Sequence, residues 1–196
     1  MNSKHPGFGY FSWKSEIVDT ALKYFPDSGI LYIDAGCELN NRLMAKLHLR
    51  WILSRAKSGD FFHTLDYPEK RYTKRLVLDY FSLSDNEASS PQFQATWFAL
   101  AGERGRLIAE TWKNGVIAGQ AMIDDTSSQE DKSYVGHRYD QSVLSCTLKS
   151  LGIKPRSHRP CYRPVSLLSS VNCYLHPIWS ARNRSGESII GMKGTK

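Results

Sequence analysis

Two aspartates lie at positions where a carboxylate could bind a ligand or take part in catalysis, and the first of them is Asp34. It directly follows the apolar run Ile30–Ile33 and is followed by Ala35 and Gly36. Such a run predicts a buried strand, and ligands of open α/β sheets bind beyond the carboxyl ends of strands. Small residues there let a ligand approach the backbone closely. Asp34 is thus a candidate binding carboxylate, but a carboxylate that only caps the loop fits the pattern equally well.

A divalent metal is the cofactor that suits this position. Mg²⁺ and Mn²⁺ prefer oxygen ligands and typically take one or two carboxylates together with substrate phosphates. Glu38 is the second carboxylate nearest to Asp34 in the sequence. We therefore expect Asp34 and Glu38 to be the protein ligands of such an ion.

The second aspartate, Asp140, lies in the segment His137–Ser142 (HRYDQS), just ahead of an amphipathic helical pattern. His137, Asp140 and Gln141 can all position hydroxyl groups, and Asp140 could accept a proton from one. An acid in the first turn of a helix is also favoured by the helix dipole alone. Spacing by itself favours this plainer interpretation.

Basic residues that could hold a phosphate occur near both ends of the chain. Lys14, beside Trp13, could anchor a phosphate as a point charge, although a core tryptophan beside a solvated lysine is the commoner arrangement. Arg182 and Arg184 could clamp a phosphate or belong to a solvated tail.

Alternating helical and strand patterns frame these residues. Apolar periodicity and chain breakers predict helices over 15–25, 40–57, 74–81, 103–118 and 140–151. Short apolar runs predict strands over 30–33, 60–65 and 92–100. In the second helix we expect Leu43, Leu47, Trp51 and Leu53 to form the apolar stripe, and Trp51, Trp97 and Trp112 to be core residues. Segment 82–90 is predicted to be loop.

The alternation predicts an α/β/α sandwich with a mostly parallel central sheet. A chain of 196 residues is expected to form a single domain over 1–196. Its core would cover 7–151, with a mobile polar loop at 124–133 and an irregular basic segment over 152–196.

Composition narrows the classes of protein to consider. A chain that is 41% hydrophobic and 23% charged is globular over most of its length. Its net charge of +7 suits nucleic acid, an anionic membrane surface or anionic small molecules, and no nucleic-acid-binding motif is present. The four cysteines lack C-x-x-C spacing, which argues against structural zinc. We expect no cleaved signal peptide, because no apolar segment follows Met1–Pro6. No apolar run approaches the ~20 residues that span a bilayer, so a cytoplasmic protein is expected.

Four segments together resemble a family of bacterial and algal-type proteins that look like glycosyltransferases with the GT-A fold. They are G-Y-x-x-W-K ending at Lys14, L-Y-I-D-A-G-C-E around Asp34, Q-A-T-W-F-A-L from Gln94, and H-R-Y-D-Q-S-V-L-S around Asp140. The resemblance covers residues 7–184, and its second and fourth segments are the specific ones. In such enzymes a carboxylate motif at a strand end holds a divalent metal against a nucleotide-sugar diphosphate.

The resemblance assigns roles to individual residues. Asp34 matches the first acid of the family's metal motif, and Gly36 replaces the second acid, so Glu38 or a water would complete the coordination. Asp140 and Gln141 match the pair near the transferring sugar, with His137 beside them in the same segment. The donor-binding residues implied are Trp13, Lys14, Asp34, Ala35, Gly36, Arg182 and Arg184, and those on the acceptor side are Gln94 and Ala95. Ser15 stands where the family usually has proline.

The resemblance also implies an additional α/β segment, with the first strand of the sheet, ahead of the G-Y-x-x-W-K motif. Relative to that pattern the chain is shortened, so a partner chain that supplies the segment is one expectation. The function implied is metal-assisted transfer of a sugar from a nucleotide-diphosphate donor to a glycan acceptor, as in cell-surface polysaccharide synthesis, at the membrane periphery of the cytoplasm. The alternatives are a truncated, inactive GT-A-like domain that binds a partner or a glycan and, ranked lower, a basic nucleic-acid-binding module.

Overall fold

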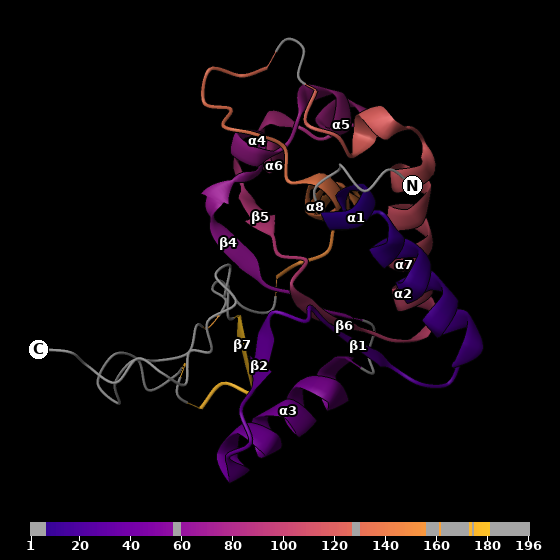
Figure 1. Cartoon of the computed structure of the whole chain (residues 1–196), viewed down its shortest axis with the longest axis vertical. Coiled ribbons are helices and arrows are strands. Elements are labelled where there is room, and N and C mark those ends of the chain that lie inside the picture. The colour runs from indigo at the N-terminus through magenta and orange to yellow at the C-terminus, as the bar shows by residue number, and fades with distance from the viewer. Residues whose placement is uncertain are drawn as a thin grey trace, which may run out of the picture.

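The computed structural model describes residues 7–56, 60–126, 130–155, 161, 173 and 175–180, and Figure 1 shows how its elements are arranged. The described helices are α1 (Gly7–Tyr10), α2 (Trp13–Tyr24), α3 (Leu43–Ala56), α4 (Glu69–Tyr72), α5 (Arg75–Tyr80), α6 (Asp85–Ser89), α7 (Gly102–Ile117), the 3-10 turn η1 (Gln120–Met122) and α8 (Tyr139–Ser150). The described strands are β1 (Ile30–Ile33), β2 (Cys37–Leu39), β3 (Asp60–Phe61), β4 (Thr64–Pro68), β5 (Pro91–Phe93), β6 (Trp97–Leu100) and β7 (Ile178–Ser180).

Every strand pair in the described part of the chain is antiparallel. The central sheet has the order β1-β6-β3, β2 pairs with β7, and β4 pairs with β5. The chain is therefore a mixed α/β protein with small antiparallel sheets, and the expected mostly parallel sheet is wrong for these residues. An apolar run reveals a strand, but it does not encode the direction in which a distant strand will pair with it.

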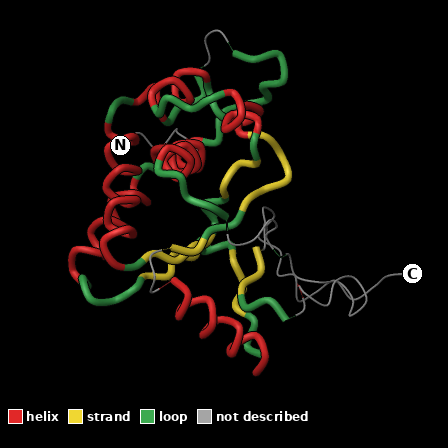
Figure 2. The backbone as a smooth tube through the Cα atoms, turned by 180° about the vertical axis from the view of Figure 1, so that it is seen from behind, coloured by secondary structure: helices red, strands yellow, loops and turns green. Residues whose placement is uncertain are grey.

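Strand β6 has a hydrophobic core on each of its faces, because successive strand residues point to opposite sides. Phe98 and Leu100 belong to the larger core, which contains residues of α2, α7 and α8. Trp97 and Ala99 belong to a smaller core with Ile52 of α3. Helices thus cover both faces of the central sheet, and Figures 1 and 2 show α3 on the side away from α2 and α7.

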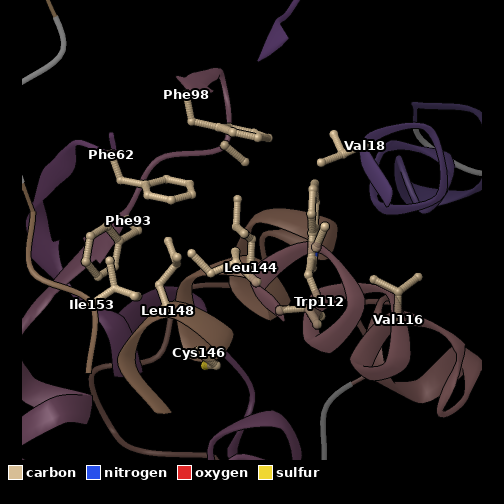
Figure 3. Packing of buried hydrophobic residues seen from close by; sticks show 14 of the residues in the cluster. Val18, Phe62, Phe93, Phe98, Trp112, Val116, Leu144, Cys146, Leu148 and Ile153 are labelled. Carbon is tan, nitrogen blue, oxygen red and sulfur yellow. The ribbon is translucent and has the colours of Figure 1, made fainter. Parts of the chain in front are cut away.

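The larger core fixes the start of α8, which carries Asp140. Trp112 of α7 is fully buried and meets Phe98 edge-on, with ring centroids 6.0 Å apart. Figure 3 shows Trp112, Phe98, Phe62 and Leu144 converging from separate parts of the chain. The Trp112 Nε1–H also donates to the Asp140 backbone oxygen at 3.2 Å. Core packing and one hydrogen bond therefore hold the first turn of α8 in place.

Several predicted elements are confirmed, and others need correction. The helices predicted over 15–25, 74–81, 103–118 and 140–151 correspond to α2, α5, α7 and α8. The strand over 30–33 is β1, but its residues are half-buried rather than buried. The strands predicted over 60–65 and 92–100 are each broken into two, β3 with β4 and β5 with β6.

The predicted loop over 82–90 contains the short helix α6. The hydroxyl of Ser84 accepts a hydrogen bond from the Glu87 backbone N–H, and the Glu87 carboxylate accepts one from the Ser84 backbone N–H. This reciprocal cap satisfies amide groups that a helix start leaves free, and it stabilises a helix too short to show apolar periodicity.

The stripe predicted for α3 is on the wrong face of the helix. Leu43, Leu47, Trp51 and Leu53 are 72%, 47%, 51% and 37% exposed, respectively. The buried residues of α3 are instead Ala45, Ile52 and Ala56. The large side chains suggested the core face, but two alanines and one isoleucine occupy it. Trp51 is thus not a core residue, whereas Trp97 and Trp112 are fully buried.

The polar segment 124–133 has neither helix nor strand in its described residues, and 127–129 lie outside them. Its first residue is anchored, since Asp124 is buried and pairs with the buried Lys74 at 2.8 Å. The start of the predicted mobile loop is therefore fixed. Most of the predicted basic segment over 152–196 lies outside the described residues.

Candidate functional site

A cavity of about 760 Å³ opens where β1 ends and α8 begins. Nine residues predicted from the sequence line it, namely Trp13, Lys14, Asp34, Ala35, Gly36, Ala95, His137, Asp140 and Gln141. They come from the start of α2, the loop after β1, the segment between β5 and β6, and the start of α8. Segments that are far apart in the sequence therefore meet at one cavity.

The ammonium group of Lys14 lies between the two aspartates. Its Nζ is 3.0 Å from Asp34 Oδ1 and 3.4 Å from Asp140 Oδ2. Lys14 is only 5% exposed, so the interpretation of this lysine as solvated is wrong. Its Nζ also lies 4.9 Å from the centre of the Phe11 ring, a cation–π distance. A buried cation thus links both candidate carboxylates.

Asp34 is held by the end of the central sheet. Its backbone N–H donates to the Thr96 oxygen at 2.8 Å, which extends the β1–β6 pairing by one residue. The Tyr32 hydroxyl donates to Asp34 Oδ1 at 2.9 Å. Burial, followed by the nearby Asp34 charge, raises the pKa of Tyr32 above its ordinary value. Tyr32 therefore remains a neutral donor that orients the Asp34 carboxylate.

Asp140 is buried, and one of its carboxylate oxygens is poorly satisfied. Burial raises the pKa of Asp140 to about 7, against the lowering effect of Lys14. Although Oδ2 lies within ion-pair distance of Lys14, it has no well-aligned hydrogen bond among the described residues. A carboxyl that changes charge near neutral pH can take up and release a proton.

Gln141 is a neighbour of the cavity whose amide is already engaged. Its Nε2 donates to Gln92 Oε1 at 2.9 Å, and its Oε1 accepts from the Ala95 backbone N–H at 3.4 Å. Gln141 therefore joins α8 to the segment after β5, and we assign it to positioning rather than to contact with a reacting group.

His137 is likewise committed to internal contacts. Its Nδ1 accepts from the Lys74 backbone N–H at 3.3 Å, and its Nε2 lies 2.9 Å from the Met122 oxygen, which fits a neutral ring that donates through Nε2. Burial and, to a lesser extent, the nearby Lys74 charge lower the pKa of His137 to about 4. His137 fixes the approach to α8 and has no ring nitrogen left for a ligand.

Arg138 is a fixed cation on the cavity wall that the sequence did not single out. Its guanidinium lies 4.4 Å and 4.0 Å from the ring centres of Tyr67 and Tyr72, and its Nη1 donates to the Tyr67 hydroxyl. Stacking on two rings orients the planar guanidinium, which presents several donors suited to phosphate or carboxylate. Arg138 is therefore a second positive group, besides Lys14, that a ligand in the cavity can meet.

Backbone strain is concentrated at the aromatic side of the cavity. Tyr10, Phe11 and Tyr139 have φ values of 57°, 61° and 47°, a region that non-glycine residues rarely occupy. The rings of Tyr10 and Tyr139 lie 5.1 Å apart, and those of Phe11 and Tyr139 lie 6.5 Å apart. Each such conformation costs on the order of 1–3 kcal/mol and tends to occur at functional sites.

Seven lining residues were not predicted as site residues, namely Phe11, Tyr32, Ile33, Thr96, Arg138, Tyr139 and Ser180. Ser180 is the most distant in sequence and lies on β7, opposite Cys37 of β2. It is 2% exposed, and its Oγ has no hydrogen-bond partner among the described residues. No local pattern marks this serine, because only the pairing of β7 with β2 brings it to the cavity.

The remaining predicted residues do not join this group. Glu38 lies on β2 opposite Trp179 and does not line the cavity. Gln94 is buried beside the cavity wall, where its backbone N–H donates to the His63 oxygen, and it does not line the cavity either. Arg182 and Arg184 lie outside the described residues.

The arrangement of charges fits an ammonium group better than a divalent ion. Asp34 and Asp140 converge as two metal ligands would, but an ion bound to both would need to lie roughly 2.0–2.6 Å from their oxygens. Lys14 Nζ already occupies the space between them. In the described part of the chain, no group of three or more His, Cys, Asp or Glu residues could hold a metal. A divalent ion would thus have to displace Lys14, and the metal stays a prediction.

A scan against protein-family models finds no match to this chain, and a search of curated proteins finds none either.

Proposed function

We propose that the chain is a glycosyltransferase of GT-A type, which transfers a sugar from a nucleotide-diphosphate donor to a hydroxyl group of a glycan. The observation that carries the proposal is the convergence of Lys14, Asp34 and Asp140 on one cavity. The volume of about 760 Å³ lies within the range of sites for small molecules and cofactors. The four segments that suggested this family meet at the same place.

In the proposed reaction Asp140 is the group that accepts a proton. The acceptor oxygen forms a bond to the anomeric carbon while the bond from that carbon to the diphosphate oxygen breaks. The hydroxyl proton passes to the Asp140 carboxylate, and the nucleoside diphosphate leaves with the bonding electron pair. A carboxyl whose pKa is about 7 is suited to this step at neutral pH.

Lys14 and Arg138 would meet the negative charge of the departing diphosphate. Both are cations on the cavity wall, and preorganised charges stabilise a leaving group without a large reorganisation. If Lys14 turns from Asp140 toward the phosphates, Asp140 is free to act as a base. The ion pair with Asp34, whose carboxylate is oriented by the Tyr32 hydroxyl, keeps the Lys14 ammonium near the site. A divalent ion, if it replaced Lys14 between the acids, would supply the same charge stabilisation.

The test measures release of nucleoside diphosphate from a panel of nucleotide sugars, with and without glycan acceptors. We expect Asp140→Asn to reduce the rate about 10²–10⁴-fold, as for loss of a general base. Asp79→Asn is the matched control, because Asp79 is an exposed aspartate that pairs with Arg75 on α5. Equal rates in the parent and the Asp140→Asn variant would contradict the proposal.

A chelator arm of the same assay decides between the lysine and the metal. Activity that persists in EDTA is expected if Lys14 supplies the positive charge. Activity that is lost in EDTA and restored by Mn²⁺ would favour the metal predicted from the sequence.

The inactive binding module remains the second candidate, and one observation favours it. Both candidate acids are paired with the same lysine, which is also how a purely structural ion pair would look. This candidate predicts glycan or nucleotide binding by calorimetry without release of nucleoside diphosphate from any donor.

A further inference from the structure

Helix α3 exposes more large apolar side chains than any other described helix. Leu43, Met44, Leu47 and Trp51 are 72%, 56%, 47% and 51% exposed, and we refer to these four residues as the α3 outer face. In Figures 1 and 2 the helix lies at one end of the molecule, away from α4, α5 and α6. Single exposed apolar residues are ordinary, but a group of four on one helix marks an interaction surface.

The outer face is continuous along the helix. At about 100° per residue, these four positions fall within an arc of roughly 100° around the helix axis. The buried residues Ala45 and Ile52 lie on the opposite side, against the smaller core. The helix therefore has two apolar faces, one covered by the sheet and one turned outward.

Basic residues border this face on both sides. By the same rotation, Lys46 and Arg50 fall on one flank and Arg55 on the other. Between Glu38 and Asp60 the sequence has five Lys or Arg residues and no acidic residue. An apolar stripe with tryptophan between basic flanks is the pattern of a helix that lies in the headgroup region of a membrane.

We propose that the α3 outer face binds an anionic lipid surface, with the helix axis in the plane of the membrane. The α3 outer face enters the boundary between headgroups and acyl chains, where Trp51 takes the interfacial position that tryptophan favours. The basic residues on both flanks contact lipid phosphates. The helix has 14 residues, and no described helix is long and apolar enough to cross a membrane, so α3 lies on the bilayer. This proposal does not depend on the glycosyltransferase proposal.

The charges argue against a second copy of the chain as the occupant. Two α3 helices related by a two-fold axis would bring their like-charged basic flanks together. An anionic lipid surface complements the same flanks.

The test is co-flotation of the full chain with vesicles of phosphatidylcholine alone or mixed with phosphatidylglycerol in equal parts. We expect binding to the mixed vesicles that weakens with salt. The double variant Leu47→Gln, Trp51→Gln should bind at least about tenfold more weakly, because it loses the free energy of transferring two apolar side chains from water to the membrane. The matched control is Leu107→Gln, Ile117→Gln on α7, whose side chains are 51% and 66% exposed. It should bind as the parent does.

Depth is measured with brominated lipids, which quench tryptophans near the acyl chains. Quenching in the parent that disappears in Trp51→Phe supports the proposal. Vesicle binding that is equal in the two double variants, or equal for neutral and anionic vesicles, overturns it. A parent that ignores vesicles but forms a dimer that Leu47→Gln, Trp51→Gln disrupts also overturns it, in favour of a second copy.

Discussion

Helix α8 carries a buried lysine–carboxylate group at each end, and the two groups differ in how completely they are satisfied. At its C-terminal end, Lys149 lies 3.0 Å from the fully buried Glu69. Glu69 also accepts hydrogen bonds from Thr73 at 2.6 Å and Gln92 at 2.9 Å, and from the Ser145 hydroxyl. At the N-terminal end, Lys14 forms ion pairs with both Asp34 and Asp140. Asp140 Oδ2 has no aligned hydrogen-bond donor in the described part of the chain.

The difference distinguishes a structural network from a candidate binding site. A buried network whose members are all satisfied rigidifies the fold, whereas an unsatisfied buried polar group carries a penalty that a ligand can remove. Of these two groups, the N-terminal one borders the cavity of about 760 Å³, together with Ser180, whose Oγ has no hydrogen-bond partner among the described residues. We therefore expect the two ends of the helix to have different roles, which the following variants can test.

The largest effect on stability is expected at the satisfied end. Glu69→Leu leaves the Lys149 charge buried without its carboxylate, which should lower the free energy of unfolding by about 3–5 kcal/mol. The double variant Glu69→Leu, Lys149→Met should recover most of this loss, since no unpaired charge remains. Urea unfolding of both variants measures the effect. A single variant within 1 kcal/mol of the parent would show that this network is not structural.

At the cavity end the expected effect depends on pH. The pKa of folded Asp140 is about 7, above its ordinary value of 3.8, so folding favours the protonated carboxyl. Its contribution to stability is fully present below about pH 4 and is lost as the pH rises through 7. Relative to Asp140→Asn, the parent should lose on the order of 4 kcal/mol of unfolding free energy between pH 4 and 8.

Urea titrations of the parent and the Asp140→Asn variant at several pH values measure this difference. Titration of the buried histidines is common to both proteins and cancels in the comparison. The rate of sugar transfer should show the opposite trend and rise through pH 7, because the base must be ionised. A pH-independent difference between the two proteins would mean that Asp140 keeps one charge state.

A smaller effect is expected for Ser180→Ala. If the unpartnered hydroxyl is held for a ligand, its removal should weaken ligand binding about tenfold, the value of one hydrogen bond of about 1.4 kcal/mol. The stability of the free protein should be unchanged or slightly higher. Calorimetry with the ligand found in the transferase assay measures the first effect, and unchanged affinity would assign Ser180 to structure alone.

The smallest effect is expected in the middle of α8. Thr147 is fully buried, and its Oγ1 has no hydrogen-bond partner among the described residues. Thr147→Val keeps the shape and removes the unsatisfied hydroxyl, so we expect a gain of about 1 kcal/mol in unfolding free energy. A loss of that size would show that the hydroxyl is satisfied in solution.

The parts of the fold that the sequence predicted are those that local patterns encode. Helices α2, α7 and α8 and strand β1 follow from periodicity and breakers within each segment. The antiparallel pairing of β1 with β6 joins residues near 30 to residues near 100, and no local pattern reports that choice. For α3 the sequence has two apolar faces, and the one with more large side chains is exposed, whereas Ala45, Ile52 and Ala56 form the core face.

The candidate site was predictable to a similar degree. Asp34, Asp140 and Lys14 could be named because each lies at the end of a recognisable element. The sequence does not show the tertiary contacts that pair these three residues. The same holds for the contacts that occupy the side chains of His137 and Gln141 and that place Ser180 at the cavity. Glu38 was chosen only for its nearness in sequence, but strand β2 carries it away from the cavity.

The order of the cavity walls along the chain has a consequence for synthesis. The walls include Lys14 near the beginning, Asp140 late in the chain, and Ser180 on the last described strand. Residues of α2, α7 and α8 can pack together as soon as position 150 has left the ribosome, but β7 arrives later. A nascent chain stalled between these points would have its main core in place and an incomplete site, so the cavity is complete only after both α8 and β7 have emerged.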